Sequence, residues 1–179
     1  MVTYKLFRLK GGKLYPLFVE CSREMVMGAW LDAGIGELAD KTHVRSRLGP
    51  LALRPGFHST EVPVTDWIGK RQGERLVQRK DTVWCECEVE GEQEPVSGRY
   101  GKRILPSDWY CFRTKPNQPF PWIISNRIKI NRILSHAEVE VIDFFKEGAM
   151  ACDGAEKERY TAILLKLLVG EEVCSDDHV

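Results

Sequence analysis

The segment Thr82–Val89, TVWCECEV, alternates apolar and polar side chains almost strictly. Four apolar or thiol side chains occupy its odd positions: Val83, Cys85, Cys87 and Val89. Trp84, Glu86 and Glu88 occupy the even ones. Successive side chains of a strand point to opposite faces, so this pattern predicts a central strand with one face in the core.

Further strand-like segments lie on both sides of this strand. Residues 4–9 and 13–19 are apolar and aromatic and are separated by a Lys-Gly-Gly turn, which predicts a β-hairpin. Downstream, residues 108–114, 122–124 and 128–134 are strand-like, with a proline-rich turn between the first two. These segments favour a mostly antiparallel sheet.

Helical patterns occur between and after the strands. Residues 22–33 follow a capping serine and place Trp30 on an apolar face, and residues 65–77 follow a capping threonine or aspartate. Ser135 to Glu138 is a capping box that begins a third helix, and 155–169 is a fourth, amphipathic one. The sequence therefore predicts an α+β fold, a mostly antiparallel sheet with three to four packed helices.

Length and composition limit the classes of function. The 179 residues fit one α+β domain over 1–148, with a helical extension and frayed tail over 149–179. With 26 basic and 26 acidic residues the chain has no net charge, which argues against broad nucleic-acid binding. No segment is apolar enough to span a membrane, so we expect a soluble, cytoplasmic protein.

The six cysteines are expected to be reduced, because a chain of this size needs no disulfide framework. Cys85 and Cys87 would point to one face of the central strand. The chain contains no Cys-x-x-Cys motif and no histidine pair at ligand spacing, so no metal is expected. Buried, apolar-like thiols are the favoured interpretation.

The segment 51–68, LALRPGFHSTEVPVTDWI, is a candidate site. Pro55 fixes its own backbone and Gly56 allows a left-handed bend, so Arg54 and His58 are delivered around a defined corner. One interpretation is that these two side chains bind a ligand. The alternative is that they only donate hydrogen bonds to backbone carbonyls. The basic loop 41–47 just before them is interpreted as solvated, with a phosphate site as the alternative.

Two more clusters could contribute to a cleft. Glu86 and Glu88 lie two residues apart beside Trp84, an arrangement that suits ribose or base binding and equally suits a solvent-facing strand. Arg113 and Trp122 belong to a tract in which polar groups alternate with aromatic ones. Arginine binds phosphate and tryptophan stacks on bases, whereas most aromatic residues of this tract are expected in the core.

Several catalytic templates are absent. The chain has no G-x-S-x-G elbow, P-loop, G-x-G-x-x-G or H-E-x-x-H motif, which argues against serine hydrolases, P-loop NTPases, Rossmann enzymes and zincins. The run His58-Ser59-Thr60 matches the H-x-T of two-histidine phosphoesterases. The second element that this mechanism needs is missing, because residues 136–138 do not provide it.

About 140 residues, from Tyr4 to Ile142, resemble in order a domain of very large polyvalent proteins of phages and mobile elements. The resemblance rests on six runs: YKLFRLKGGKLYPLFV, AWLDAG, LGPLALRPGFHSTEVP, VWCECEV, WYCFRTKPN and PWIISNRIKINRILSHAEV. It implies a phage or mobile-element origin, the host cytoplasm as the location, and delivery or counter-defence as the setting.

The layout is also similar to ADP-ribosyltransferase-like domains, in which first-strand and second-strand residues grip NAD and a later glutamate polarises the ribose. This similarity implies an ADP-ribosyltransferase-like fold with NAD as substrate. The catalytic candidates are Glu86, Glu88 and His58. The NAD-binding candidates are Arg8, Arg54, Ser59, Arg113 and Trp122. The alternative is a non-catalytic phage module that binds a nucleotide, nucleic acid or host protein, through the aromatic tract or the helix 155–169.

Overall fold

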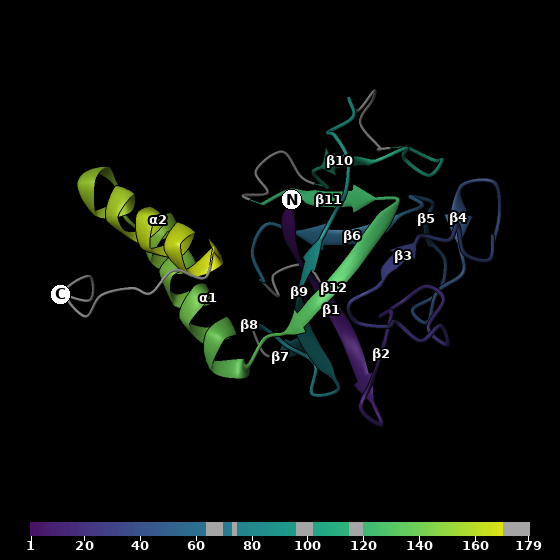
Figure 1. Ribbon diagram of the computed structural model, residues 1–179, viewed down its shortest axis with the longest axis horizontal. Helices are drawn as coiled ribbons and strands as arrows, with labels where there is room; N and C mark the ends of the chain where they lie inside the picture. Colours follow the sequence, from purple (N-terminus) through teal and green to yellow (C-terminus); the bar gives the residue numbers. More distant parts are fainter. Residues whose placement is uncertain (64–69, 73–74, 96–101, 115–119, 170–179) are drawn as a thin grey trace. The chain divides into compact units, whose positions relative to one another are not determined.

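The computed structural model describes residues 1–63, 70–72, 75–95, 102–114 and 120–169. These residues belong to two compact units, which are described separately (Figure 1). The sheet unit runs to Leu134, and the helical unit contains Val62 and the residues from Ser135 onward. This division falls earlier in the chain than the boundary at 148 that the sequence favoured.

The described part of the sheet unit contains twelve strands: β1 (Val2–Lys10), β2 (Lys13–Tyr15), β3 (Trp30–Asp32), β4 (His43–Val44), β5 (Leu51–Ala52), β6 (Phe57–Thr60), β7 (Lys70–Gln72), β8 (Arg75–Val77), β9 (Thr82–Glu88), β10 (Trp109–Phe112), β11 (Trp122–Ser125) and β12 (Arg127–Ile133). Eight of them form one sheet in the order β10-β11-β6-β1-β9-β12-β3, with β2 paired to β1. All strand pairs are antiparallel, as predicted. Strands β4–β5 and β7–β8 form two small sheets.

Strand β9 is central, as its alternating pattern predicted. It pairs with β1 over seven residues and with β12 on its other edge. Cys85 and Cys87 are fully buried in the core cluster and Val89 lies with them. Glu86 and Glu88, on the opposite face, are partly exposed. The predicted strand and its core face are thus confirmed, whereas Trp84, on the same face as the two glutamates, is 1% exposed.

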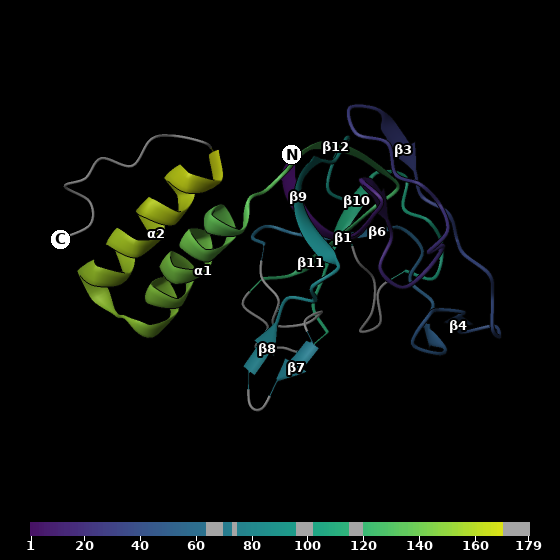
Figure 2. The same ribbon diagram turned by 90° about the horizontal axis from the view of Figure 1, so that it is seen from below.

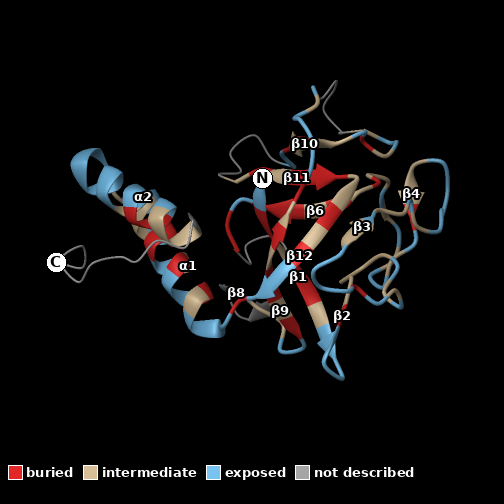
Figure 3. Ribbon diagram, viewed as in Figure 1, coloured by how far each residue is buried: buried red, intermediate tan, exposed pale blue. Residues whose placement is uncertain are grey.

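The sheet curves around its core. Leu31 of β3 and Cys111 of β10 come from opposite ends of the sheet, yet both pack against one cluster that contains Phe7 and Ile130. Figure 3 shows the buried residues concentrated along the strands. A register shift in β12 between Ile130 and Arg132 interrupts its pairing with β9, and such irregularities increase local twist. The curvature brings both ends of the sheet to the same apolar interior.

The helical unit contains α1 (His136–Ala151) and α2 (Gly154–Val169), which lie side by side (Figure 2). The predicted capping box is confirmed: the Ser135 hydroxyl accepts from the Glu138 amide at 3.2 Å, and the Glu138 carboxylate accepts from the Ser135 amide at 2.7 Å. Tyr160 of α2 packs on Phe145 of α1 at 6.0 Å between ring centroids. No helix in the described residues is long and apolar enough to cross a membrane.

The prediction of three to four helices is wrong, because the described residues form two. Residues 22–33 are not helical: Met25 bridges to Leu14, Gly28 adopts a left-handed φ of 79°, and β3 begins at Trp30. The pairing of Trp30–Asp32 with β12, at the edge of the sheet, outweighs the helical propensity that the apolar spacing indicated. The start of the helix predicted over 65–77 lies outside the described residues, and residues 75–77 form β8 instead.

Strand β6 was not predicted. The sequence pattern assigns no element to residues 57–60, which form an interior strand between β1 and β11. Ser59 and Thr60 are buried there, each 1% exposed, and their hydroxyls donate to backbone carbonyls. A four-residue strand with two hydroxyl side chains shows no apolar alternation, so its position depends on partners far away in the sequence.

Candidate functional site

The candidate site lies where β1 and β6 separate. In the antiparallel pairing of these two strands, Tyr4 lies opposite Thr60. Beyond that pair, the Nζ of Lys5 donates a hydrogen bond of 2.8 Å to the carbonyl oxygen of His58. A cavity of about 400 Å³ adjoins this opening, and Tyr4, Lys5 and His58 are among its lining residues.

Five chain segments and four single residues form the cavity wall. They are 4–6, 16–20, 33–35, 51–52 and 54–58, with Val44, Trp84, Thr114 and Trp122. The wall is mainly apolar and includes four aromatic side chains besides Tyr4: Phe18, Phe57, Trp84 and Trp122. Pockets of this size and composition are typical of small-molecule sites.

Burial lowers the pKa of two basic side chains in the cavity wall, Lys5 on β1 and His58 on β6. Lys5 lies among Phe7 and Phe57, and desolvation lowers the pKa of its amine to about 8. Desolvation, reinforced by the nearby positive charges of Lys5 and Arg54, lowers the pKa of His58 to about 3. The His58 imidazole is therefore neutral at physiological pH, and the Lys5 amine remains mostly protonated there.

Arg54 supplies the second positive charge of the cavity. Its guanidinium lies 4.4 Å from the centre of the Phe112 ring, a cation–π distance. Desolvation lowers its pKa without removing its charge, since a guanidinium stays protonated in proteins. Arg54 and Lys5 are thus two basic residues in the wall of a mainly apolar cavity.

The turn at Pro55 and Gly56 positions Arg54 and His58, as predicted. Gly56 has a left-handed φ of 128°. A β-carbon at this position would lie 2.7 Å from Ile124 Cγ2 and 3.0 Å from the Ser125 carbonyl oxygen. Only glycine therefore lets the turn approach β11 so closely.

Two tryptophans contribute to the wall from different strands. Trp122 of β11 meets the His58 ring edge to face, with centroids 6.2 Å apart. Trp84 of β9 is 1% exposed, and its indole Nε1 is buried without a hydrogen-bond partner among the described residues. Flat aromatic rings such as these favour a ligand that carries a ring of its own.

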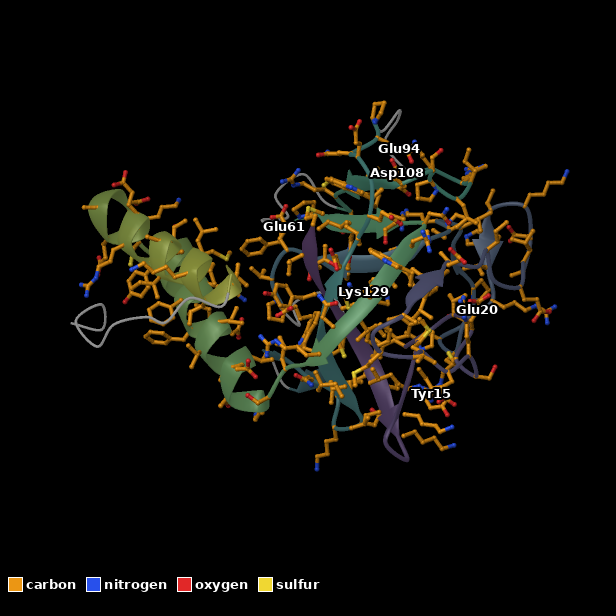
Figure 4. The ribbon with its side chains drawn as sticks, viewed as in Figure 1. Tyr15, Glu20, Glu61, Glu94, Asp108 and Lys129 are labelled. Carbon is orange, nitrogen blue, oxygen red and sulfur yellow. The ribbon has the colours of Figure 1, made fainter. Side chains whose placement is uncertain are left out.

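Glu20 provides the carboxylate among the residues that line the cavity (Figure 4). It adopts a left-handed φ of 50°, which is uncommon for a residue with a side chain. Its Oε2 lies 3.3 Å from Arg23 Nη1, and its Oε1 lies 2.2 Å from the position that a β-carbon on Gly34 would take. Glu20 could not be identified from the sequence, because no motif around it signals a site.

The structure brings together three of the predicted site residues, Arg54, His58 and Trp122. The two predicted catalytic carboxylates are elsewhere. Glu86 is paired with Arg132 Nε at 2.9 Å and Glu88 with Lys129 Nζ at 2.9 Å, and neither glutamate lines the cavity. Figure 4 labels Lys129 on β12. These ion pairs give both glutamates a structural role between β9 and β12.

The remaining predicted residues are also outside the cavity wall. Arg8 lines a smaller, separate pocket and donates from Nη2 to the Cys21 carbonyl at 2.6 Å. Ser59 is buried, and its hydroxyl donates to the Ile123 carbonyl at 3.3 Å. Arg113 is exposed and does not line the cavity.

Polar contacts outside the cavity stabilise the ends of strands. Glu94 and Asp108 lie side by side near β10 (Figure 4), where Glu94 Oε1 accepts from the Asp108 amide at 2.6 Å. Lys102 forms an ion pair with the same glutamate. Within the described residues, no group of three or more His, Cys, Asp or Glu side chains is arranged to hold a metal ion.

The cavity therefore offers two cations, a neutral imidazole, one carboxylate and aromatic walls. A matching ligand carries negative charge at one part and a flat or apolar body at another. Comparison with known proteins adds no relative: no family model, curated protein or solved structure matches this chain.

Proposed function

We propose that the protein binds a nucleotide in this cavity, with NAD as the first candidate. One observation carries the proposal: two basic residues, Lys5 and Arg54, line a cavity of about 400 Å³ whose wall is otherwise mainly apolar and aromatic. Phosphate oxygens suit such cations, and Arg54 can bind two of them through its planar guanidinium. An ADP-ribosyltransferase-like arrangement of the sheet is part of the same proposal.

The state of Lys5 supports an anionic ligand. No carboxylate among the described residues contributes to the pKa of its amine, which burial lowers to about 8. A bound phosphate would supply the missing negative charge and raise that pKa again. Trp84 and Trp122 would contact the base or the nicotinamide ring.

Binding without turnover is favoured over transfer through the predicted glutamates. Glu86 and Glu88 are held in ion pairs away from the cavity wall. In the phage or mobile-element setting that the sequence resemblance implies, such a binder would sense or sequester the nucleotide in the host cytoplasm. Counter-defence is a role consistent with this activity.

Glu20 favours a second candidate function, cleavage of NAD. Its carboxylate is on the cavity wall, and its left-handed backbone is the kind of strain found at functional sites. In this reaction the bond between ribose and nicotinamide breaks, the pyridine ring keeps the electron pair, and Glu20 stabilises the positive charge that develops on the ribose. A water molecule then bonds to the same ribose carbon and releases its proton to the solvent.

Proton NMR with NAD tests both candidates. We expect saturation transfer from the wild-type protein to NAD, loss of this transfer in Arg54→Gln, and retention in the matched control Arg132→Gln. Release of free nicotinamide that stops in Glu20→Gln would establish cleavage. Absence of transfer, or equal transfer in Arg54→Gln, would contradict nucleotide binding in the cavity.

A further inference from the structure

A second pocket, of about 100 Å³, lies on the other side of Leu17 and Phe18, since these two residues line both it and the cavity. Three arginines, Arg8, Arg47 and Arg79, also line it and define the arginine pocket. They come from three separate parts of the chain. The backbone around each one is fixed, so their convergence is a property of the fold.

Backbone hydrogen bonds hold the arginines in place. Arg8 is in β1, between its partners Tyr15 and Thr82. The Arg79 carbonyl accepts from the Thr82 amide at 3.1 Å and from its hydroxyl at 2.6 Å. The Arg47 amide donates to the Phe18 carbonyl at 3.0 Å, which ties the third arginine to the wall shared with the cavity.

The charges of this pocket are not balanced. Asp81 is the carboxylate among its lining residues, against three guanidinium groups. None of the carboxylates in the described residues forms an ion pair with Arg8, Arg47 or Arg79. Arg8 and Arg79 are partly buried and Arg47 is exposed. Like charges brought together in this way repel one another.

Two of these arginines also carry hydrogen-bond donors that have no acceptor among the described residues. The Nε atoms of Arg8 and Arg79 are both buried without a hydrogen-bond partner in the part of the chain described. Arg8 uses its Nη2 on the Cys21 carbonyl, and this contact leaves its Nε unpaired. A buried donor without an acceptor is costly, so an anion that accepts from these groups would remove two unfavourable features at once.

We propose that the arginine pocket binds a phosphate group. A small tetrahedral oxyanion suits the volume of the pocket, and its several oxygens can accept from more than one guanidinium. The phosphate is either inorganic or part of an organic phosphate. This proposal stands apart from nucleotide binding in the cavity, because different residues carry it.

The test is a titration of the protein with inorganic phosphate, followed by the arginine Nε–H signals in NMR. Sodium chloride at equal ionic strength is the control for screening. We expect saturable shifts of the Arg8 and Arg79 signals. Affinity should fall about tenfold in Arg47→Gln, which removes one charge-assisted contact. Arg45→Gln, an exposed neighbour paired with Glu37, should bind like the wild type.

The outcomes separate the proposal from its alternatives. Shifts that do not saturate or that chloride reproduces would overturn it, as would an Arg8 shift that persists unchanged in both Arg47→Gln and Arg79→Gln. A parallel titration with NAD distinguishes the source of the phosphate: competition between the two ligands assigns the pocket to an organic phosphate, and independent binding assigns it to the free ion. Failure of NAD to bind at all leaves the phosphate result intact.

Discussion

The Nζ of Lys5 donates a hydrogen bond of 2.8 Å to the carbonyl oxygen of His58 across the opening between β1 and β6. This bond occupies a carbonyl next to the point where the two strands separate. It also joins the two residues whose pKa values are lowered most clearly in the cavity. The same hydrogen bond therefore links the two strands and holds the Lys5 amine close to His58.

Replacing Lys5 by methionine should change how stability depends on pH. The Lys5 amine titrates at about 8 in the folded protein and near 10.5 in the unfolded chain. Between these values the unfolded chain holds one more proton, so this lysine makes folding more favourable as the pH rises. Unfolding free energies at about pH 8 and about pH 10 should show wild type gaining roughly 2 kcal/mol relative to Lys5→Met. An unchanged difference would refute the low pKa.

Acid should destabilise the fold through His58. Burial and the charges of Lys5 and Arg54 keep its folded pKa at about 3, below the ordinary 6.5. As the pH falls from about 6.5 to about 4.5 only the unfolded chain takes up this proton, which costs the folded state about 2 kcal/mol. Denaturant titrations should show this loss reduced in His58→Gln. The exposed His136→Gln variant should behave like wild type. Equal effects of the two variants would contradict a neutral His58 in the folded protein.

Gly56→Ala should be more costly than Gly49→Ala. Both glycines have left-handed φ angles, 128° and 99°, so each substitution introduces strain of about 1–2 kcal/mol. Only at Gly56 would the new methyl also meet Ile124 and Ser125, whereas nothing lies within 4 Å at Gly49. Thermal unfolding should show about twice the loss for Gly56→Ala. Equal losses would indicate that the turn does not approach β11 so closely.

The two core thiols should resist alkylation in the folded protein. Burial raises the pKa of Cys85 to about 12 and raises that of Cys87 as well, so neither thiol ionises near neutral pH. Cys21 is partly exposed. Mass spectrometry after iodoacetamide treatment at about pH 8 should find modification at Cys21 and none at the core pair until denaturant is added. Rapid labelling of Cys85 without denaturant would place it outside the core.

The strands whose side chains alternate could be predicted from the sequence, and the others could not. Thr82–Val89 carries its own pattern, and the hairpin of β1 and β2 is specified by its glycine turn. Residues 57–60 have no such pattern, since their burial depends on β1 and β11. Residues 22–33 show a helical spacing that long-range pairing with β12 overrides at Trp30.

The candidate site was predictable in part for the same reason. Arg54 and His58 flank a turn whose geometry Pro55 and Gly56 determine locally. The placement of these two side chains therefore follows from residues next to them in the sequence. Lys5 and Glu20 reach the cavity through tertiary structure, and nothing adjacent to them in the sequence indicates this. Glu86 and Glu88 looked like a site because their partners on β12 could not be identified from the sequence.

The indole N–H signals of Trp84 and Trp122 test the central claim most directly. In a two-dimensional NMR titration with NAD, both signals should shift saturably, because these rings line the cavity. The signals of Trp30 and Trp109, which are not on its wall, should stay in place. If no indole signal shifts, or if the Trp30 signal shifts as far as the Trp84 signal, the cavity does not bind this nucleotide.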